Sequence, residues 1–256
     1  MRYCSIDCET TGLNRETCQI LEIGAIIEDC GNPLPFDKLP KRRIVIDRHQ
    51  VTGEPYAINM NARIFKMLAQ AQDIKDKVER DAFKEANGIV SEDGAVRMLW
   101  EFLYLHGFGE KYTVSMDKPE NNAGLTYEQA MSMAGGDLSK IELPKLNRRH
   151  QIKVNVAGKN FATFDKVFLE KLPGFTDLIR FRQRILDPVT SYADFLHDEE
   201  APGMDKCFTK LGVGHMVSHD AVDDAWGVIQ LLRPLYLTYD TRILAMNLAH
   251  LAQNSA

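Results

Sequence analysis

The sequence predicts an α/β fold, with a mixed β-sheet flanked by helices. Three consecutive strand-like runs occupy the N-terminal part of the chain, and a helical stretch follows them. The second half then alternates strand-like and helix-like segments. Strands joined by short turns form an antiparallel meander, whereas strand and helix alternation adds parallel strands. A chain of 256 residues is long enough to bury one large core, and we expect one domain.

The three N-terminal strands are expected at Tyr3–Glu9, Ile20–Glu28 and Arg42–Ile46, because these runs are apolar or alternate in polarity. The turn-prone segment 10–14 separates the first two strands and makes them antiparallel neighbours. A polar, helix-permissive region follows over about 59–85, and residues 95–103 carry an apolar stripe at helical spacing.

The second half contains two further strand and helix pairs. Val154–Ala157 reads as a buried strand that leads into a helix over Phe164–Leu172, which Pro173 and Gly174 end. Arg184–Asp187 is the expected final strand. The run Ala221–Leu237 is apolar at helical spacing, and Pro234 should kink or shorten this helix.

The domain is expected to span residues 1–240, with an insertion at about 109–150 and a C-terminal helical tail at 241–256 packed on it. The insertion interrupts the alternation of strands and helices and contains one short predicted helix near Tyr127–Ala134. In the tail, a helix is expected over Ile243–Leu251. No repeat, low-complexity tract or linker divides the chain.

Composition excludes several classes of protein. No apolar run reaches the roughly 18 residues of a membrane span, and the first residues lack the pattern of a secretory signal, so we expect a soluble, cytoplasmic protein. The five cysteines are odd in number and lack paired spacing, which argues against a disulfide framework or a structural zinc site. A net charge of −5 means that any attraction for nucleic acid must be local, with metal ions as one source of positive charge.

Two carboxylates converge at the end of the first strand. Side chains alternate along a strand, so Asp7 and Glu9 share a face. Like charges this close are unfavourable unless a cation lies between them, and Mg²⁺ or Mn²⁺ prefers such oxygen ligands. An isolated pair of this kind is also compatible with a solvated strand edge, so the segments around it decide the interpretation.

Three segments together resemble the motifs of the DnaQ-like exonuclease superfamily, in its histidine-bearing branch. Asp7-Cys8-Glu9-Thr10-Thr11-Gly12 resembles the first motif. Segment 160–165 resembles the second, in which an Asn precedes a Phe-Asp pair opening a helix, and segment 219–224 resembles the third, with its His five positions before the last Asp. The order and approximate separation of the motifs also agree, and the resemblance covers most of the chain apart from the insertion and the tail.

The resemblance implies a ribonuclease H-like fold and a 3′-to-5′ exonuclease that releases 5′-mononucleotides from single-stranded nucleic acid. It implies that Asp7, Glu9, Asp165 and Asp224 hold two Mg²⁺ or Mn²⁺ ions, with His219 as the general base. The substrate-binding positions that it implies are Thr10, Thr11, Gly12, Leu13, Asn160 and Phe164.

Several alternatives stay open at the level of sequence. Asp223 lies beside Asp224, although its spacing from His219 favours Asp224 as the ligand, and His215 reads as a loop or core histidine. A non-cleaving module that binds nucleic-acid ends and a polymerase-associated proofreading subunit are alternative functions. A polymerase or a second copy of the chain is a possible partner, and the preference for DNA or RNA is open.

Three basic clusters and one aromatic group read first as ordinary surface and core. The basic clusters are Lys41-Arg42-Arg43, Arg148-Arg149-His150 and the alternating Arg180, Arg182 and Arg184, with phosphate contact as the alternative. Trp100 and the aromatic residues that follow it fall inside an amphipathic helix pattern and are expected in the core.

Overall fold

The computed structural model describes residues 1–115, 122–212 and 218–253. A five-stranded mixed sheet forms its centre, in the order β4-β3-β2-β1-β8. The strands β1, β2 and β3 form an antiparallel meander, while β4 pairs with β3 and β8 pairs with β1 in parallel. The bounds are β1 (Arg2–Thr10), β2 (Ile20–Asp29), β3 (Lys41–Ile46), β4 (Ile89–Val90) and β8 (Val156–Ala157).

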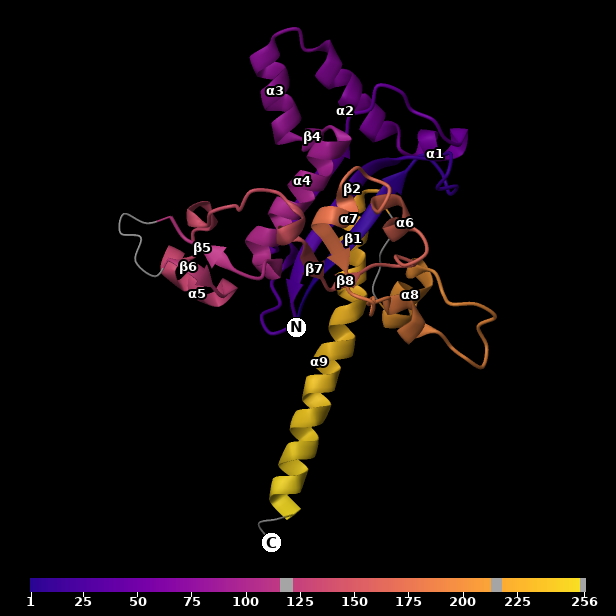
Figure 1. Ribbon diagram of the computed structural model, residues 1–256. Coiled ribbons are helices and arrows are strands. Elements are labelled where there is room, and N and C mark those ends of the chain that lie inside the picture. Colours follow the sequence, from indigo (N-terminus) through magenta and orange to yellow (C-terminus); the bar gives the residue numbers. More distant parts are fainter. Residues whose placement is uncertain (116–121, 213–217, 254–256) are drawn as a thin grey trace.

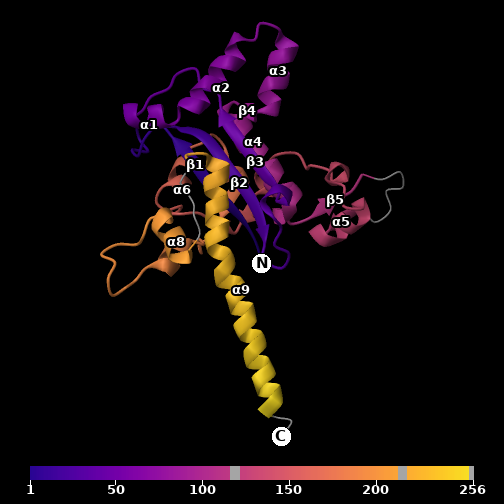
Figure 2. The same cartoon turned by 180° about the vertical axis from the view of Figure 1, so that it is seen from behind.

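Helices cover both faces of this sheet (Figures 1 and 2). Their bounds are α1 (Pro55–Met60), α2 (Ala62–Asp73), α3 (Lys77–Ala86), α4 (Glu92–Leu103), α5 (Tyr127–Ala134), α6 (Asp165–Leu169), α7 (Phe175–Leu178), α8 (Met204–Leu211) and α9 (Ala221–Gln253). Two small sheets pair β5 (Tyr112–Thr113) with β6 (Ala123–Leu125), and β7 (Ile152–Val154) with β9 (Ile179–Phe181).

Alternation along β1 determines what lies on each face. Cys4 and Ile6 point into a core that includes the buried residues of α4. Tyr3 belongs to a second core formed with α8 and α9, and the Ser5 hydroxyl donates to the Ala225 carbonyl of α9 at 2.8 Å. Odd-numbered residues of β1 therefore face α9, which is the side on which Asp7 and Glu9 must lie.

The sheet meets the start of α9 at a very short distance. Gly24 of β2 has no side chain, and a Cβ built there would lie 2.1 Å from the carbonyl carbon of Ala221. Only glycine permits this approach of two backbones. The N-terminus of α9 is thereby seated directly against β2.

The predicted meander, its strand positions and the insertion helix agree with the structure within one or two residues. The predicted strand Val154–Ala157 is instead divided between β7 and β8, which lie in different sheets. The predicted final strand Arg184–Asp187 is reduced to one bridge, between Ala157 and Leu186, while β9 provides the longer pairing. Both differences have one cause, because pairing partners distant in sequence decide which short apolar runs become strands.

The C-terminal part of the chain also differs from the expectation. One helix, α9, runs through Pro234 to Gln253, and no separate tail helix begins near Ile243. Figures 1 and 2 show its C-terminal half projecting beyond the sheet instead of lying on the domain. Among the side chains of α9 that the structure describes, which end at Leu237, the last buried one is Leu232. Among the described residues, no helix is apolar over enough of its length to cross a membrane.

Residues 109–150, expected as an insertion, form the β5–β6 pair and α5 beside the central sheet (Figure 1). Thr126 begins α5 with a capping box, in which its hydroxyl accepts from the Gln129 amide while the Gln129 side chain accepts from the Thr126 amide. Gly135 ends the helix in the left-handed conformation. These local signals explain why this helix was predictable from sequence inside an otherwise irregular segment.

Candidate metal centre and active site

The C-terminal end of β1 carries Asp7 and Glu9 toward the start of α9. Glu9 is 7% exposed and Asp7 is partly buried, so neither is a freely solvated strand-edge acid. Both line a cleft of about 430 Å³ together with Asp224 and His219. The first and third sequence motifs, which stand near opposite ends of the chain, therefore meet in one place.

Asp165 approaches Asp7 and Glu9 from the helix α6. It is the first residue of α6, is 2% exposed, and accepts a hydrogen bond from the Cys8 amide at 2.9 Å. This bond links α6 to the middle of the acid pair on β1. Phe164, immediately before the helix, lines the cleft.

Asp224 lies in the first turn of α9 and is 6% exposed. Its Oδ1 accepts from the amide and the hydroxyl of Ser218, at 3.2 and 3.3 Å. Asp223 beside it is exposed and is not among the cleft residues. Of the two acids left open by sequence, the structure brings Asp224 to the other carboxylates.

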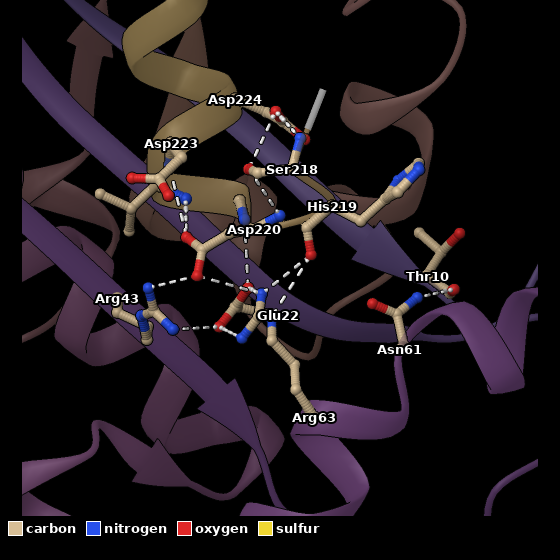
Figure 3. A network of polar contacts seen from close by, with 12 residues as sticks. Thr10, Glu22, Arg43, Asn61, Arg63, Ser218, His219, Asp220, Asp223 and Asp224 are labelled. Carbon is tan, nitrogen blue, oxygen red and sulfur yellow. Dashed lines mark hydrogen bonds and ion pairs between the residues drawn. The ribbon is translucent and has the colours of Figure 1, made fainter. Parts of the chain in front are cut away.

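His219 is exposed and has a positive φ of 52°, a conformation that residues other than glycine rarely adopt. Its carbonyl oxygen accepts from Nε and Nη2 of Arg63, at 3.3 and 3.2 Å. Figure 3 shows this oxygen turned toward Arg63 while the imidazole ring extends to the other side. Ligand atoms of His219, Glu9 and Asp224 lie within 4.8 Å of one another.

A buried ionic network supports the segment that carries His219 and the start of α9 (Figure 3). Glu22 of β2 is fully buried, pairs through both carboxylate oxygens with Arg63, and accepts from the Ala221 amide at 3.2 Å. Arg43 of β3 donates to Asp220 at 2.6 Å and lies 3.4 Å from Glu22. The network joins β2, β3, α2 and the first residues of α9.

Burial, together with the clustering of the acids, raises the pKa of three of them. Burial, and then the charges of Asp165, Asp224 and Glu9, raise the pKa of Asp7 well above its ordinary value. Burial and then Asp224 raise the pKa of Glu9, while His219 and a hydrogen bond from Asn61 act in the opposite direction. Burial is also the main cause that raises the pKa of Asp165.

This donor set fits divalent cations. Within the described ranges, Asp7, Glu9 and Asp165 form no ion pair with a lysine or arginine. The nearby Arg43 and Arg63 pair instead with Glu22 and Asp220. Carboxylates gathered this closely are costly unless a cation neutralises them. Asp7, Glu9, Asp165 and Asp224 offer the hard oxygen ligands that Mg²⁺ and Mn²⁺ prefer, and a His219 nitrogen is within reach of the same position.

The cleft also contains residues that the motifs did not indicate. Tyr56 lines it and, like the predicted Leu13, is 77% exposed, and Asn61 donates to the Thr10 carbonyl at 3.1 Å from inside it. Glu54 accepts from the Leu13 amide at 3.2 Å and so attaches the loop after β1 to the start of α1. The only sequence signal for Tyr56 is a large aromatic residue in an otherwise polar stretch.

The structure places four of the six predicted substrate-binding residues at the cleft. Thr10, Gly12, Leu13 and Phe164 line the cleft. Thr11 is fully buried, and its hydroxyl donates to the Thr52 carbonyl at 2.6 Å, so its side chain secures the loop. Asn160 is exposed with a φ of 53°, and its amide donates to Asp187 at 2.9 Å. Neither Thr11 nor Asn160 is among the cleft residues.

The structure also gives the surroundings of other residues that the sequence analysis named. Trp100 is fully buried, and its indole donates to the His150 carbonyl at 3.0 Å. All five cysteines are free thiols. Arg148 pairs with Asp177 at 2.9 Å. His215 lies outside the described residues.

Comparison with known proteins identifies similar folds. No protein-family model and no curated protein matches the chain. Among solved structures, it is similar to E. coli Exonuclease I, determined in complex with a dT13 oligonucleotide, with 13% sequence identity and a TM-score of 0.51. The alignment covers 97% of this chain and 44% of that chain, so this chain spans less than half of it. The likeness, together with the mixed sheet, shows a ribonuclease H-like α/β fold.

The chain is also similar to a 3′-exonuclease from a structure of 3′-end specific recognition of a histone mRNA stem-loop. The identity is 11% and the TM-score is 0.47, with 93% of this chain and 82% of that chain covered. A score this low supports nothing further. Identities this low show the fold alone, and the chemistry of the chain depends on the residues of its cleft.

Proposed function

We propose that this chain is a metal-dependent 3′-to-5′ exonuclease that hydrolyses single-stranded DNA or RNA to 5′-mononucleotides. The observation that carries the proposal is the convergence of three carboxylates, Asp7, Glu9 and Asp224, and one exposed histidine on a single cleft, with the buried Asp165 close to Asp7. The 3′ direction and the mononucleotide product rest on the resemblance of the three motifs. The fold likeness to Exonuclease I is consistent with the proposal.

In this proposal Asp7, Glu9, Asp165 and Asp224 hold two divalent ions. When bound, the ions would neutralise the scissile phosphate and make an attacking water more acidic. The chain supplies the positions of the carboxylates. The Cys8 amide orients Asp165, and Ser218 orients Asp224, so each acid is held by its neighbours before a ligand arrives.

His219 acts as the general base. Its ring is exposed at the cleft, where it can reach a water molecule, and lies beside Glu9 and Asp224. A histidine can accept a proton near neutral pH and pass it to solvent. The two hydrogen bonds from Arg63 to the His219 carbonyl hold the backbone while leaving the ring available.

The terminal nucleotide would bind against the loop after β1. Leu13 and Tyr56 present exposed apolar surface on the cleft, which is the surface that unstacked bases pack on. Lys159 also lines the cleft and supplies a cation for a phosphate oxygen. Sugar identity is not encoded in these contacts, so both DNA and RNA belong in the test.

The test is hydrolysis of 5′-labelled single-stranded DNA and RNA with Mg²⁺ or Mn²⁺, with and without a chelator. We expect a ladder that shortens from the 3′ end and disappears with chelator. Asp224→Asn should reduce the rate at least about 100-fold, equal to about 2.7 kcal/mol of transition-state stabilisation.

Asp223→Asn is the matched control, because it removes the same charge one residue away at an exposed position outside the cleft. This variant should cleave at nearly the wild-type rate. Cleavage that persists in chelator, or equal losses in the two variants, would contradict the proposed metal site.

A further inference from the structure

The small sheet formed by β7 and β9 places two cations side by side. Lys153 is directly opposite Arg180 in the parallel register, between the pairs Ile152 with Ile179 and Val154 with Phe181. The flanking apolar pairs are buried, so Lys153 and Arg180 face solvent. Like charges directly opposite one another destabilise a sheet unless an anion lies between them.

Arg182 and Arg184 extend this pair along the chain. The Arg182 amide donates to the Val154 carbonyl at 2.8 Å, which continues the pairing one step beyond β9. Alternate residues of an extended segment share a face and are about 7 Å apart. Arg180 and Arg182 therefore share a face, and Arg184, beyond a bend at Gln183, lines the same cavity; all three are exposed.

None of these four side chains forms an ion pair or side-chain hydrogen bond with another residue in the described parts of the chain. They line a cavity of about 490 Å³, and Lys153 and Arg182 also line an adjoining cavity of about 340 Å³. Arg2 lines the second cavity but is paired with Asp29 at 3.1 Å, and Glu110 is the acid there. We call the surface of Lys153, Arg180, Arg182 and Arg184 the basic groove.

Four exposed cations around one cavity suit a ligand with repeated negative charges. Guanidinium groups bind phosphate oxygens through paired N–H donors. Among the described residues, the aromatic side chains that line these two cavities are Phe108 and Phe181, and both are buried, so the groove offers no exposed ring for stacking bases. The chemistry therefore favours a phosphodiester backbone, bound without regard to sequence.

The groove is separate from the cleft, since no residue of the basic groove lines the cleft. Arg2, at the groove, is the first residue of β1, whereas Asp7 lies five residues further along that strand. At about 3.4 Å per residue, Arg2 and Asp7 are about 17 Å apart along the strand. A nucleic acid would have to extend several nucleotides from the cleft to reach the groove.

We propose that the basic groove binds the phosphate backbone of a single-stranded nucleic acid at nucleotides upstream of its 3′ end. The inference rests on the proposed function for the identity of the ligand as the substrate strand. It adds that affinity depends on strand length: a strand too short to leave the cleft gains nothing from the groove, whereas a longer strand is held at two places.

The experiment measures binding in chelator, where hydrolysis does not interfere, by fluorescence anisotropy of a labelled trinucleotide and a much longer oligonucleotide over a range of salt concentrations. The groove variant changes all four cations to glutamine. A control variant removes the same charge from exposed lysines elsewhere that form no ion pair with a described residue, namely Lys38, Lys75, Lys140 and Lys145.

We expect the groove variant to bind the long strand at least about 10-fold more weakly. The slope of log K against log salt should fall by about 0.7 for each phosphate group that the variant no longer neutralises. Trinucleotide binding should be unchanged, and the control should retain the wild-type salt dependence. Thermal unfolding should show no loss of stability, because the Lys153 and Arg180 side chains repel each other.

The outcomes separate this inference from the proposed function. Unchanged long-strand affinity and salt dependence in the groove variant overturn the groove as a nucleic-acid site, even if the wild type is an active exonuclease. Binding of polyglutamate as tightly as the long strand also overturns it, because the groove would then recognise acidic protein. Loss of long-strand binding by the groove variant supports it, even if the wild type cleaves nothing.

Discussion

Removing one of the clustered acids should stabilise the metal-free protein, and Asp165→Asn is the clearest case. Asp165 is 2% exposed, and burial raises the pKa of its carboxyl from 3.8 to about 7. A raised pKa means that ionisation costs more in the folded chain than in the unfolded one. The contribution of Asp165 to stability is therefore highest below about pH 4 and is lost as the pH rises through about 7.

The magnitude follows from the size of this shift. Each pKa unit corresponds to about 1.4 kcal/mol, so ionised Asp165 costs about 4 kcal/mol in the folded state. Asparagine has nearly the same shape, and its Oδ1 can still accept from the Cys8 amide. Because other acids of the cluster also respond, we expect Asp165→Asn to stabilise the chelated protein by about 2–4 kcal/mol at pH 8.

Denaturant unfolding in chelator at pH 8 and at pH 4 measures this effect. At pH 4 the difference between variant and wild type should nearly vanish, and m should be equal in both proteins. Added Mg²⁺ should raise the stability of the wild type more than that of the variant, since binding to the folded state stabilises it. A variant that is less stable than the wild type at pH 8 in chelator would refute the argument that the burial and crowding of these acids prepare a cation site.

Three further predictions concern the supports of the site. Gly24→Ala would place a Cβ 2.1 Å from the Ala221 backbone and displace the start of α9, so it should lower the free energy of unfolding in denaturant by about 3 kcal/mol or more and impair cleavage. A loss below about 1 kcal/mol would argue against the close approach. Arg63→Ala should lower the free energy of unfolding by about 3 kcal/mol, because it leaves the fully buried Glu22 with only the weaker Arg43 pair. A thermal unfolding curve that matches the wild type would show that the network contributes little. His219→Gln should lower kcat and flatten the fall in rate at acidic pH while keeping the wild-type melting temperature, and an unchanged pH profile would remove His219 from the role of base.

Local chemistry was enough to predict much of the molecule. The alternation of Tyr3 to Glu9 places two acids on one face of a strand, and Thr126 and Gly135 delimit a helix. These features depend on neighbours in sequence, so they survive without knowledge of the rest of the fold. The fold class followed from the order of such segments.

Features that depend on distant partners were not predictable in the same way. The division of Val154–Ala157 into two strands depends on β9 and β1, and Arg184–Asp187 finds only one bridge partner. Likewise α9 continues past Pro234 although proline usually ends a helix. Short apolar runs are compatible with several pairings, and tertiary contacts select one.

The sequence by itself determined which chemical groups the proposed site would contain, since the resemblance of three motifs names four acids and a histidine before the fold is known. Only the tertiary structure decided what holds them, including Glu22 between Arg43 and Arg63, and Gly24 beneath the start of α9. It also decided that Tyr56 joins the cleft. The physical reason is that a side chain carries its own chemistry, whereas its burial, charge partners and distances arise only when segments far apart in the chain pack together.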